Sequence, residues 1–139
     1  MSSYQSINPA NNQLLKSWPS HDEAAVSHAL EVADRLFHSS WSKGDIQPRL
    51  QVLKKLADLI DSRAEELATI ASKEMGKLIG QSRGEVKICS QIARYYAENA
   101  ERILQPQSYP SDLGEAWVEY HPIGVLVAVE PWNFPYYQL

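Results

Sequence analysis

The sequence has little cysteine, no strong imbalance of charge and no long apolar run. Cys89 is the single cysteine among 139 residues, so no disulfide can form within the chain, as is typical of proteins from a reducing cytosol. Lys and Arg number 13 against 17 acidic residues, for a net charge of −4. No basic stripe indicates binding to nucleic acid or to an anionic membrane.

Membrane insertion and secretion also find no support. The longest uncharged apolar run, residues 123–129, is far too short to span a bilayer. The chain does not open with a basic region followed by an apolar one, as a secretory signal would. The four histidines have no metal-ligand spacing and no second cysteine joins them, so we expect no metal site. We expect a cytoplasmic protein without a membrane anchor.

Enough apolar sequence is present for one compact domain. Hydrophobic residues make up 44% of the chain, and the mean hydropathy is −0.37.

Two short runs, 4–7 and 13–18, flank the turn-forming residues 8–12 and predict a β-hairpin. Ser20 and Glu23 have the spacing of a capping box, which predicts that a helix follows and that Gly44 ends it.

Two further apolar stripes predict two more helices, so we expect three long helices in all. The first stripe runs over 50–75 and stops at Gly76, and the second runs over 86–104. Gly80 and Gly84 then punctuate helices, because their spacing does not fit a dinucleotide fingerprint. We expect Glu85 to cap the third helix near its start, although the residue type would also allow a general base.

The last third of the chain changes character. Residues 107–114 are rich in turn formers and predict a loop, and 116–120 alternate as a strand does. The unbroken apolar run 124–129 predicts a strand covered on both faces, as in a parallel sheet. Pro131 and Pro135 must end that strand and stiffen the loop between them.

The loop holds one candidate site residue, Asn133. Ligands of open α/β sheets bind outside the carboxyl ends of the strands, where this loop would lie. The side chain of Asn133 could act there, or it could merely satisfy local backbone groups.

Several of these strings resemble the aldehyde dehydrogenase superfamily. Glu130-Pro-Trp-Asn-Phe-Pro135 after a Gly-Val-Leu-Val-Ala-Val strand is similar to the family. His121-Pro-Ile-Gly-Val and Tyr136-Tyr-Gln-Leu139 are most like its succinate-semialdehyde dehydrogenase branch. Glu74-Met-Gly-Lys77 and Gly84-Glu-Val86 stand where the family has similar residues.

The resemblance implies an α/β fold that is the N-terminal part of the aldehyde dehydrogenase fold, and it covers only the opening part of the family's sequence. Residues 1–139 would divide into three parts. Residues 1–107 would form the hairpin and helices, and 108–121 a loop and an oligomerisation-arm strand. Residues 122–139 would supply the first parallel strand of a Rossmann-like cofactor domain, followed by the site loop.

The resemblance also implies roles for the loop. The Asn133 amide would donate a hydrogen bond to the substrate carbonyl oxygen as negative charge develops on it. Backbone groups of Glu130, Pro131, Trp132 and Asn133 would lie along the nicotinamide-ribose part of NAD or NADP. Phe134 and Gln138 match positions that line the substrate tunnel, although Phe134 could equally be a core residue.

The family's nucleophilic cysteine and its water-activating glutamate would lie beyond Leu139, and Cys89 has the apolar neighbours of a core cysteine. We therefore expect an N-terminal fragment that is inactive alone. The resemblance implies that the intact protein oxidises an aldehyde, of which succinate semialdehyde is the best match, and that it forms a homodimer or homotetramer. The alternative is a non-catalytic helical module that binds a partner through its exposed strand 115–121.

Overall fold

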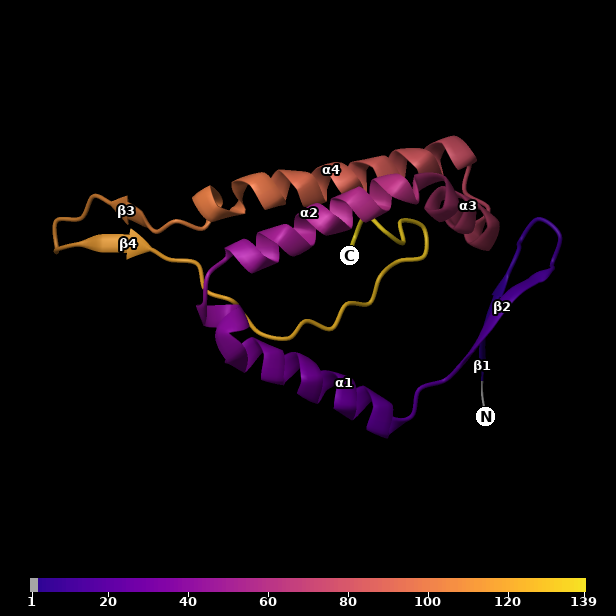
Figure 1. Ribbon diagram of the computed structural model, residues 1–139, viewed down its shortest axis with the longest axis horizontal. Helices are drawn as coiled ribbons and strands as arrows, with labels where there is room; N and C mark the ends of the chain where they lie inside the picture. Colours follow the sequence, from indigo (N-terminus) through magenta and orange to yellow (C-terminus); the bar gives the residue numbers. More distant parts are fainter. Residues whose placement is uncertain (1–2) are drawn as a thin grey trace.

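The structure is a computed structural model that describes residues 3–139 (Figure 1). Helices and short strands combine in it, which confirms the α/β class. The elements in chain order are β1 (Ser3–Ile7), β2 (Leu14–Pro19), α1 (Glu23–Leu36), the π-helical turn η1 (Phe37–Trp41), α2 (Gln47–Ser62), α3 (Ala64–Met75), α4 (Ile79–Ile103), β3 (Gln107–Tyr109) and β4 (Ala116–Val118).

The predicted N-terminal hairpin is confirmed. β1 and β2 pair antiparallel, with Tyr4 opposite Trp18. Asn8 closes the turn, because its side-chain oxygen accepts from the backbone N–H of Ala10 at 2.9 Å and its own N–H donates to the oxygen of Gln13 at 2.9 Å. The hairpin lies at one end of the molecule, beside α3 (Figure 1).

The cap of α1 differs from the expected one. Asp22, rather than Ser20, is the N-cap, and its carboxylate accepts from the N–H of Ala25 at 2.8 Å. An aspartate three residues before a free N–H satisfies it as well as a serine does. α1 contains no buried residue, and it lies apart from the other helices in Figure 1.

The expected single helix over 50–75 is two helices, so the number of long helices was wrong. The chain leaves helical geometry at Arg63, with φ −111° and ψ 16°. The Arg63 guanidinium then donates to both oxygens of Glu66, at 2.9 and 2.6 Å, at the start of α3. Neither Gly nor Pro marks this break, so the apolar pattern alone could not reveal it. Gly76 ends α3 with φ 74°, as predicted.

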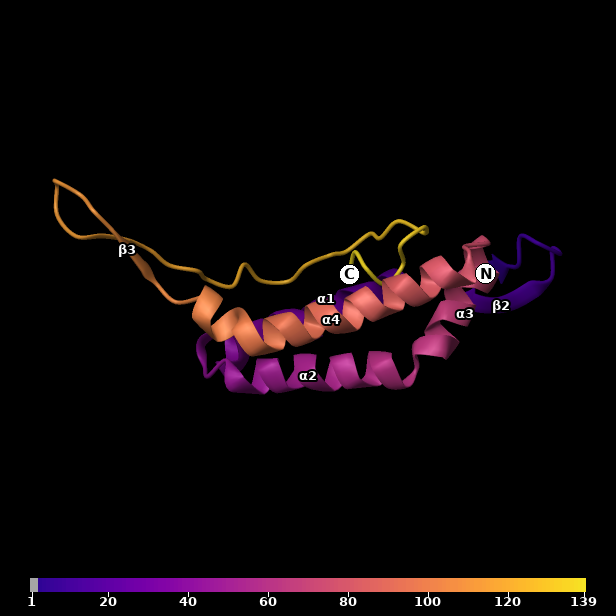
Figure 2. The same ribbon diagram turned by 90° about the horizontal axis from the view of Figure 1, so that it is seen from above.

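The core lies where α2 and α3 pack against α4 (Figures 1 and 2). α4 begins at Ile79, which places Gly80 and Gly84 inside the helix and corrects their predicted role as helix breaks. Small side chains dominate the buried set and let the helices approach closely. Its apolar members are Leu50, Ala57, Ala68, Ala71, Val86, Ala93 and Ala97.

A second hairpin projects from the opposite end of the molecule (Figure 1). β3 pairs antiparallel with β4, with Ser108 opposite Trp117. The strand expected within 116–120 is therefore confirmed over 116–118, whereas the loop expected over 107–114 was wrong at 107–109, which form β3.

The predicted parallel strand over 124–129 is absent from the described structure. Within residues 3–139, the strands pair only as β1 with β2 and β3 with β4. The apolar side chains of this segment are exposed, with 79% of Val127 and 91% of Val129 accessible. A strand forms only by hydrogen bonding to a neighbour, and no neighbouring strand accompanies this one in the described residues.

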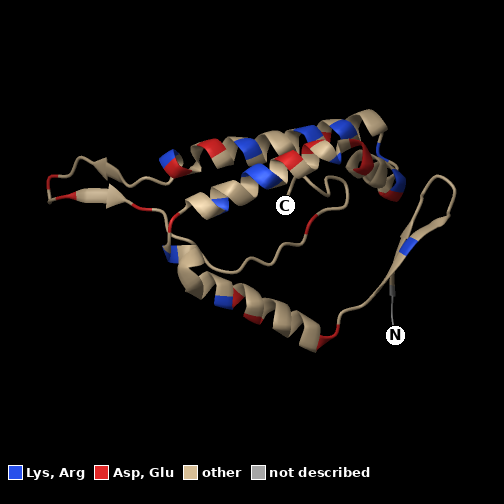
Figure 3. Cartoon of the chain, in the orientation of Figure 1, with Lys and Arg blue, Asp and Glu red and all other residues tan. Residues whose placement is uncertain are grey.

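The helices and the C-terminal segment also differ in their content of charged residues. Acidic and basic residues are interspersed along α2, α3 and α4, whereas the segment that returns from the second hairpin to the C-terminus has almost none (Figure 3). None of the helices in the described residues combines the length and apolarity needed to cross a membrane.

Candidate functional site

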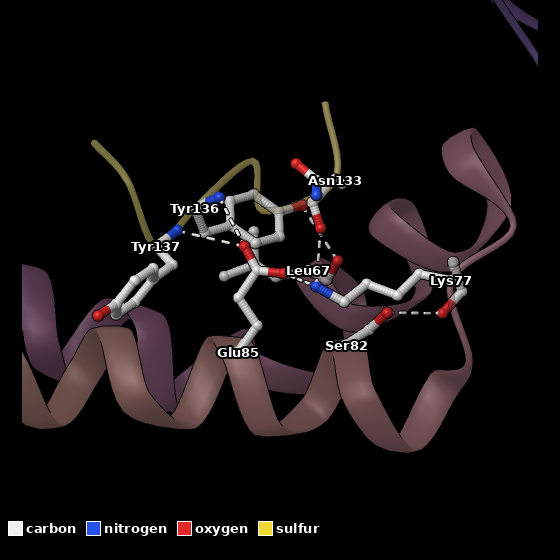
Figure 4. Close-up of polar contacts among 8 residues, drawn as sticks. Leu67, Lys77, Ser82, Glu85, Asn133, Tyr136 and Tyr137 are labelled. Atoms are coloured by element: carbon white, nitrogen blue, oxygen red, sulfur yellow. Dashed lines mark hydrogen bonds and ion pairs between the residues drawn. The ribbon is translucent and has the colours of Figure 1, made fainter. Parts of the chain in front are cut away.

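The loop that follows the exposed segment turns back onto the N-terminal half of α4. Residues 132–137 form two successive turns between Pro131 and the chain's last residues. Side chains from α4 and from the link between α3 and α4 reach the loop (Figure 4). The candidate residue Asn133 lies in the first of the two turns.

A buried ion pair lies under the loop. Lys77 precedes α4, and its ammonium is 2.5 Å from Oε2 of Glu85. Their side chains are only 5% and 1% exposed. Fully buried Lys and Glu are rare unless they are paired, so this contact accounts for how both charges are tolerated in the interior.

Glu85 also binds the backbone of the loop. Its other carboxylate oxygen, Oε1, accepts hydrogen bonds from the N–H groups of Tyr136 at 2.9 Å and Tyr137 at 3.2 Å. These are the first two N–H groups of the second turn. The first N–H groups of a helical turn have no backbone partner within the turn itself. One carboxylate from α4 therefore caps a turn that lies 51 residues later in the chain.

Lys77 binds the first turn of the loop. Its ammonium donates to the backbone oxygen of Asn133 at 2.9 Å, and it lies 3.8 Å from the centre of the Phe134 ring. The Phe134 ring in turn meets Tyr137 edge-on at 6.3 Å. Lys77 and Glu85 thus hold the two turns on either side of Pro135.

Tyr136 adds a third anchor, on α3. Its hydroxyl donates to the backbone oxygen of Leu67 at 3.0 Å. Burial raises the pKa of Tyr136 above its ordinary value of 10.0, and the negative charges of Glu74, Glu85 and Glu66 add to the shift. The phenol therefore stays protonated and able to donate through the physiological range.

The structure places the predicted site residues along the outer face of the loop. Asn133 is exposed, and its side chain projects away from α4 while its backbone oxygen faces Lys77 (Figure 4). Trp132 is 74% exposed, whereas Glu130 and Pro131 are half-buried. The carboxamide of Asn133 is thus neither sealed in the interior nor used to hold the loop.

The two predicted tunnel residues lie apart. Phe134 lines a cleft of about 410 Å³ between the loop and α4, together with Lys77 and Ile88. Gln138 is exposed near the C-terminus and does not line that cleft. Phe134 therefore packs against Lys77.

Lys77 and Glu85 were not identified from the sequence as the residues that hold the loop. Glu85 was expected to cap the start of a helix, but it lies inside α4 and caps a distant turn instead. A usable signal was present: Glu85 falls between Ser82 and Val86 on the buried face of the helical period. A charged residue on that face requires a partner, and the structure supplies Lys77, eight residues earlier in the chain.

An apolar groove of about 480 Å³ runs between α2, α4 and the end of the loop. Cys89 lines it, and desolvation raises the pKa of its thiol, with the charge of Glu85 adding to the effect. A thiol with a raised pKa is a poor nucleophile, which agrees with the predicted packing role. Within residues 3–139, no three His, Cys, Asp or Glu side chains are grouped so that they could hold a metal ion.

Comparison with known proteins gives consistent matches. The model of the aldehyde dehydrogenase family matches residues 1–139. The succinate-semialdehyde dehydrogenase [NADP(+)] of Deinococcus radiodurans is 34% identical over 136 residues, which are 98% of this chain and 28% of that protein. A probable succinate-semialdehyde dehydrogenase [NADP(+)] of Synechocystis is 36% identical over 96% of this chain and 29% of its own length.

Solved structures agree with the fold. The succinic semialdehyde dehydrogenase of Streptococcus pyogenes, solved with NADP+ as cofactor, superposes with a TM-score of 0.90 at 37% identity, over 97% of this chain and 30% of that one. The arrangement of hairpins and helices is therefore that of the N-terminal part of the aldehyde dehydrogenase fold, as expected. The chain spans less than a third of the length of the relatives that it matches.

Proposed function

The chain belongs to the aldehyde dehydrogenase family, and from that premise we propose that it is the N-terminal part of an enzyme that oxidises an aldehyde to its carboxylic acid. The observation that carries the proposal is the Asn133 carboxamide, exposed on a loop whose backbone is fixed from beneath by Lys77 and Glu85. A fixed donor costs no reorganisation when charge develops on a bound substrate, which is the requirement for stabilising an oxyanion.

The role that we assign to Asn133 is hydrogen-bond donation. Its side-chain N–H₂ would bind the aldehyde oxygen while a thiolate attacks the carbonyl carbon and the oxygen gains negative charge. An acidic side chain at this position would repel the charge, and an apolar one would donate nothing. Cys89 is not the thiolate, because it lines an apolar groove and its pKa is raised. We place the nucleophile and the water-activating glutamate outside residues 1–139.

The cofactor in this proposal is NAD or NADP, which accepts two electrons from the substrate when it is bound. The loop leaves room for such a group beside Trp132, whose side chain is 74% exposed. Backbone groups of Glu130, Pro131, Trp132 and Asn133 would lie against the nicotinamide ribose. The names of the relatives favour NADP.

Succinate semialdehyde is the substrate that the names of the relatives support best. Phe134 and Gln138 would contribute to the wall of the substrate tunnel, and the polar side chain of Gln138 suits a substrate with a second polar end. The cytosol, with its reduced thiols, suits an enzyme of this chemistry.

The second hairpin supports an oligomeric protein, a homodimer or homotetramer. β3 and β4 project from the helices, and Trp117 and Tyr109 are 57% and 52% exposed on them. Exposed strand edges can pair with another chain. The same feature supports the alternative, a non-catalytic module that pairs through residues 115–121. Light scattering that gave a monomeric full-length protein would count against the homodimer and the homotetramer.

Substitution of Asn133 tests the proposed function. In the full-length protein that carries this chain, Asn133→Ala should lower kcat by about 10²–10³, while the Kd for the cofactor changes little. Asn133→Asp should be at least as slow, because its charge opposes the oxyanion. A matched control is Gln138→Ala, which removes an amide that we place on the tunnel wall and should mainly change KM. If kcat is unchanged in Asn133→Ala, Asn133 has no part in the mechanism.

A further inference from the structure

We propose that Lys77 and Glu85 are positioning residues for the oxyanion donor: they fix the backbone of the Asn133 loop and thereby set the reaction rate without touching the substrate. The inference rests on the proposed role of Asn133. The hydrogen bonds from Lys77 to Asn133 and from Tyr136 and Tyr137 to Glu85 carry it.

The geometry of the contacts points to positioning. Lys77 binds the backbone oxygen of Asn133 itself, at 2.9 Å. Glu85 binds the chain two and three peptide groups further on, beyond Pro135, at 2.9 and 3.2 Å. The ion pair of 2.5 Å links the two anchors to each other. Two linked anchors on either side of a proline leave the intervening backbone little freedom to rotate. The backbone from which the Asn133 side chain extends is therefore held in place.

The other hydrogen-bonding contacts of the loop among the described residues bind its backbone less directly. The segment before the loop, 123–129, forms no strand ladder in the described structure and is largely exposed. Tyr136 reaches Leu67 through a hydroxyl at the end of a long side chain, which fixes the backbone less directly than a bond to the peptide group does. The anchors therefore come mainly from the ion pair.

The chemical identity of the pair also fits positioning better than stability. Burying an ion pair costs desolvation, and an apolar pair of similar volume often stabilises a fold as well or better. An apolar pair, however, cannot bind a peptide N–H and a peptide C=O. A displacement of about 1 Å at a reacting group can cost 10²-fold in rate, so directional bonds to this backbone would be worth their cost in stability.

The kinetic test is a double-mutant cycle in the full-length protein. Glu85→Gln and the pair swap Lys77→Met with Glu85→Met should each lower kcat by about 10- to 100-fold, with the cofactor Kd within about threefold of wild type. In the background of Asn133→Ala, the same changes should lower kcat by no more than about threefold, because residues that act as a unit are non-additive. Effects that multiply with that of Asn133→Ala would overturn the inference.

The pair swap keeps the test independent of folding, because it leaves no uncompensated buried charge. The matched control is Arg83→Gln. Arg83 lies on the same helix and forms a 2.7 Å ion pair with Glu65, but both side chains are more than half exposed. Arg83→Gln should leave kcat unchanged. If it lowers kcat as much as the pair swap does, the effect is a general loss at α4 and the inference is wrong.

Amide hydrogen exchange supplies a readout that needs no activity. In the full-length protein, the N–H groups of Tyr136 and Tyr137 should exchange at least about tenfold faster in the pair swap than in wild type, while the exchange of α2 amides stays the same. Unchanged exchange at both amides would overturn the inference. If Asn133→Ala leaves kcat unchanged, the proposed role of Asn133 fails, and the exchange result alone then decides whether the pair positions the loop.

Discussion

Residues 123–129 and 133–137 are close in sequence, yet the structure treats them in opposite ways. The first segment is the most apolar stretch of the chain, but it forms no strand ladder, and 91% of Val129 is exposed. The second is a proline-interrupted loop without regular structure, but it is tied to α3 and α4 by charged and polar contacts (Figure 4).

The difference lies in where each segment finds its partners. A strand needs neighbouring strands for both its hydrogen bonds and its faces, and the described residues supply none for 123–129. The loop needs only the side chains of Lys77 and Glu85, and both lie within this chain. An apolar pattern therefore predicts that a segment needs neighbouring strands, whereas only the structure shows whether those strands are present.

The largest effect should come from removing one charge of the buried pair. Glu85→Ala leaves the Lys77 ammonium buried without its partner, which should lower the free energy of unfolding by about 3–5 kcal/mol. Urea denaturation measures this directly. Arg83→Gln, at an exposed pair on the same helix, should change stability little. Equal losses for the two variants would show that the loop's anchor is no different from a surface contact.

The buried pair of Lys77 and Glu85 could be predicted from the sequence only in part. The hairpin at 3–19, the stop at Gly76 and the exposed loop of Asn133 follow from local chemistry, namely turn formers, a left-handed glycine and two prolines. The charge of Glu85 was visible on a buried helical face, but its partners lie at Lys77 and at Tyr136 and Tyr137. Contacts between distant segments depend on how helices pack, which no local pattern specifies.

The predictions of one continuous helix over 50–75 and of a strand over 124–129 failed for related reasons. The apolar stripe continues through 50–75 without a helix breaker, so the pattern gives no sign of the change in backbone geometry at Arg63 that separates α2 from α3. The pattern of 124–129 states a preference for a sheet, and the sheet depends on strands outside the segment. The fold class was predictable, whereas the register and continuity of its elements were not.

A second contrast compares packing in the helices with packing in the exposed segment. Leu50 on α2 is 5% exposed, so Leu50→Ala should lower the free energy of unfolding by about 2–5 kcal/mol. Val127 is 79% exposed, and Val127→Ala should change it by less than about 0.5 kcal/mol. Thermal or urea unfolding of this chain measures both values. A large loss for Val127→Ala would mean that the segment is packed after all.

The smallest effect concerns the third anchor of the loop. Tyr136→Phe removes the hydrogen bond to Leu67 and should lower the free energy of unfolding by about 0.5–1.5 kcal/mol. The pKa of Tyr136 is raised in the folded state, so its contribution is complete below its ordinary value of 10.0 and is lost as the pH rises above that value.

The pH dependence gives that prediction its control. Unfolding curves of wild type and Tyr136→Phe should differ by a constant amount between about pH 7 and pH 9 and should converge in more alkaline solution. A gap that stays constant above pH 10 would mean that the Tyr136 hydroxyl is not buried by the loop's contact with α3.

The most direct test of the whole account compares the two segments within one molecule. Amide hydrogen exchange, followed by NMR on the 139-residue chain, reads both segments under the same global stability. We predict that the amides of Tyr136 and Tyr137 exchange at least about tenfold more slowly, relative to their intrinsic rates, than those of Val125, Val127 and Val129. Equal protection of the two segments would contradict the claim that Lys77 and Glu85 hold the Asn133 loop in place.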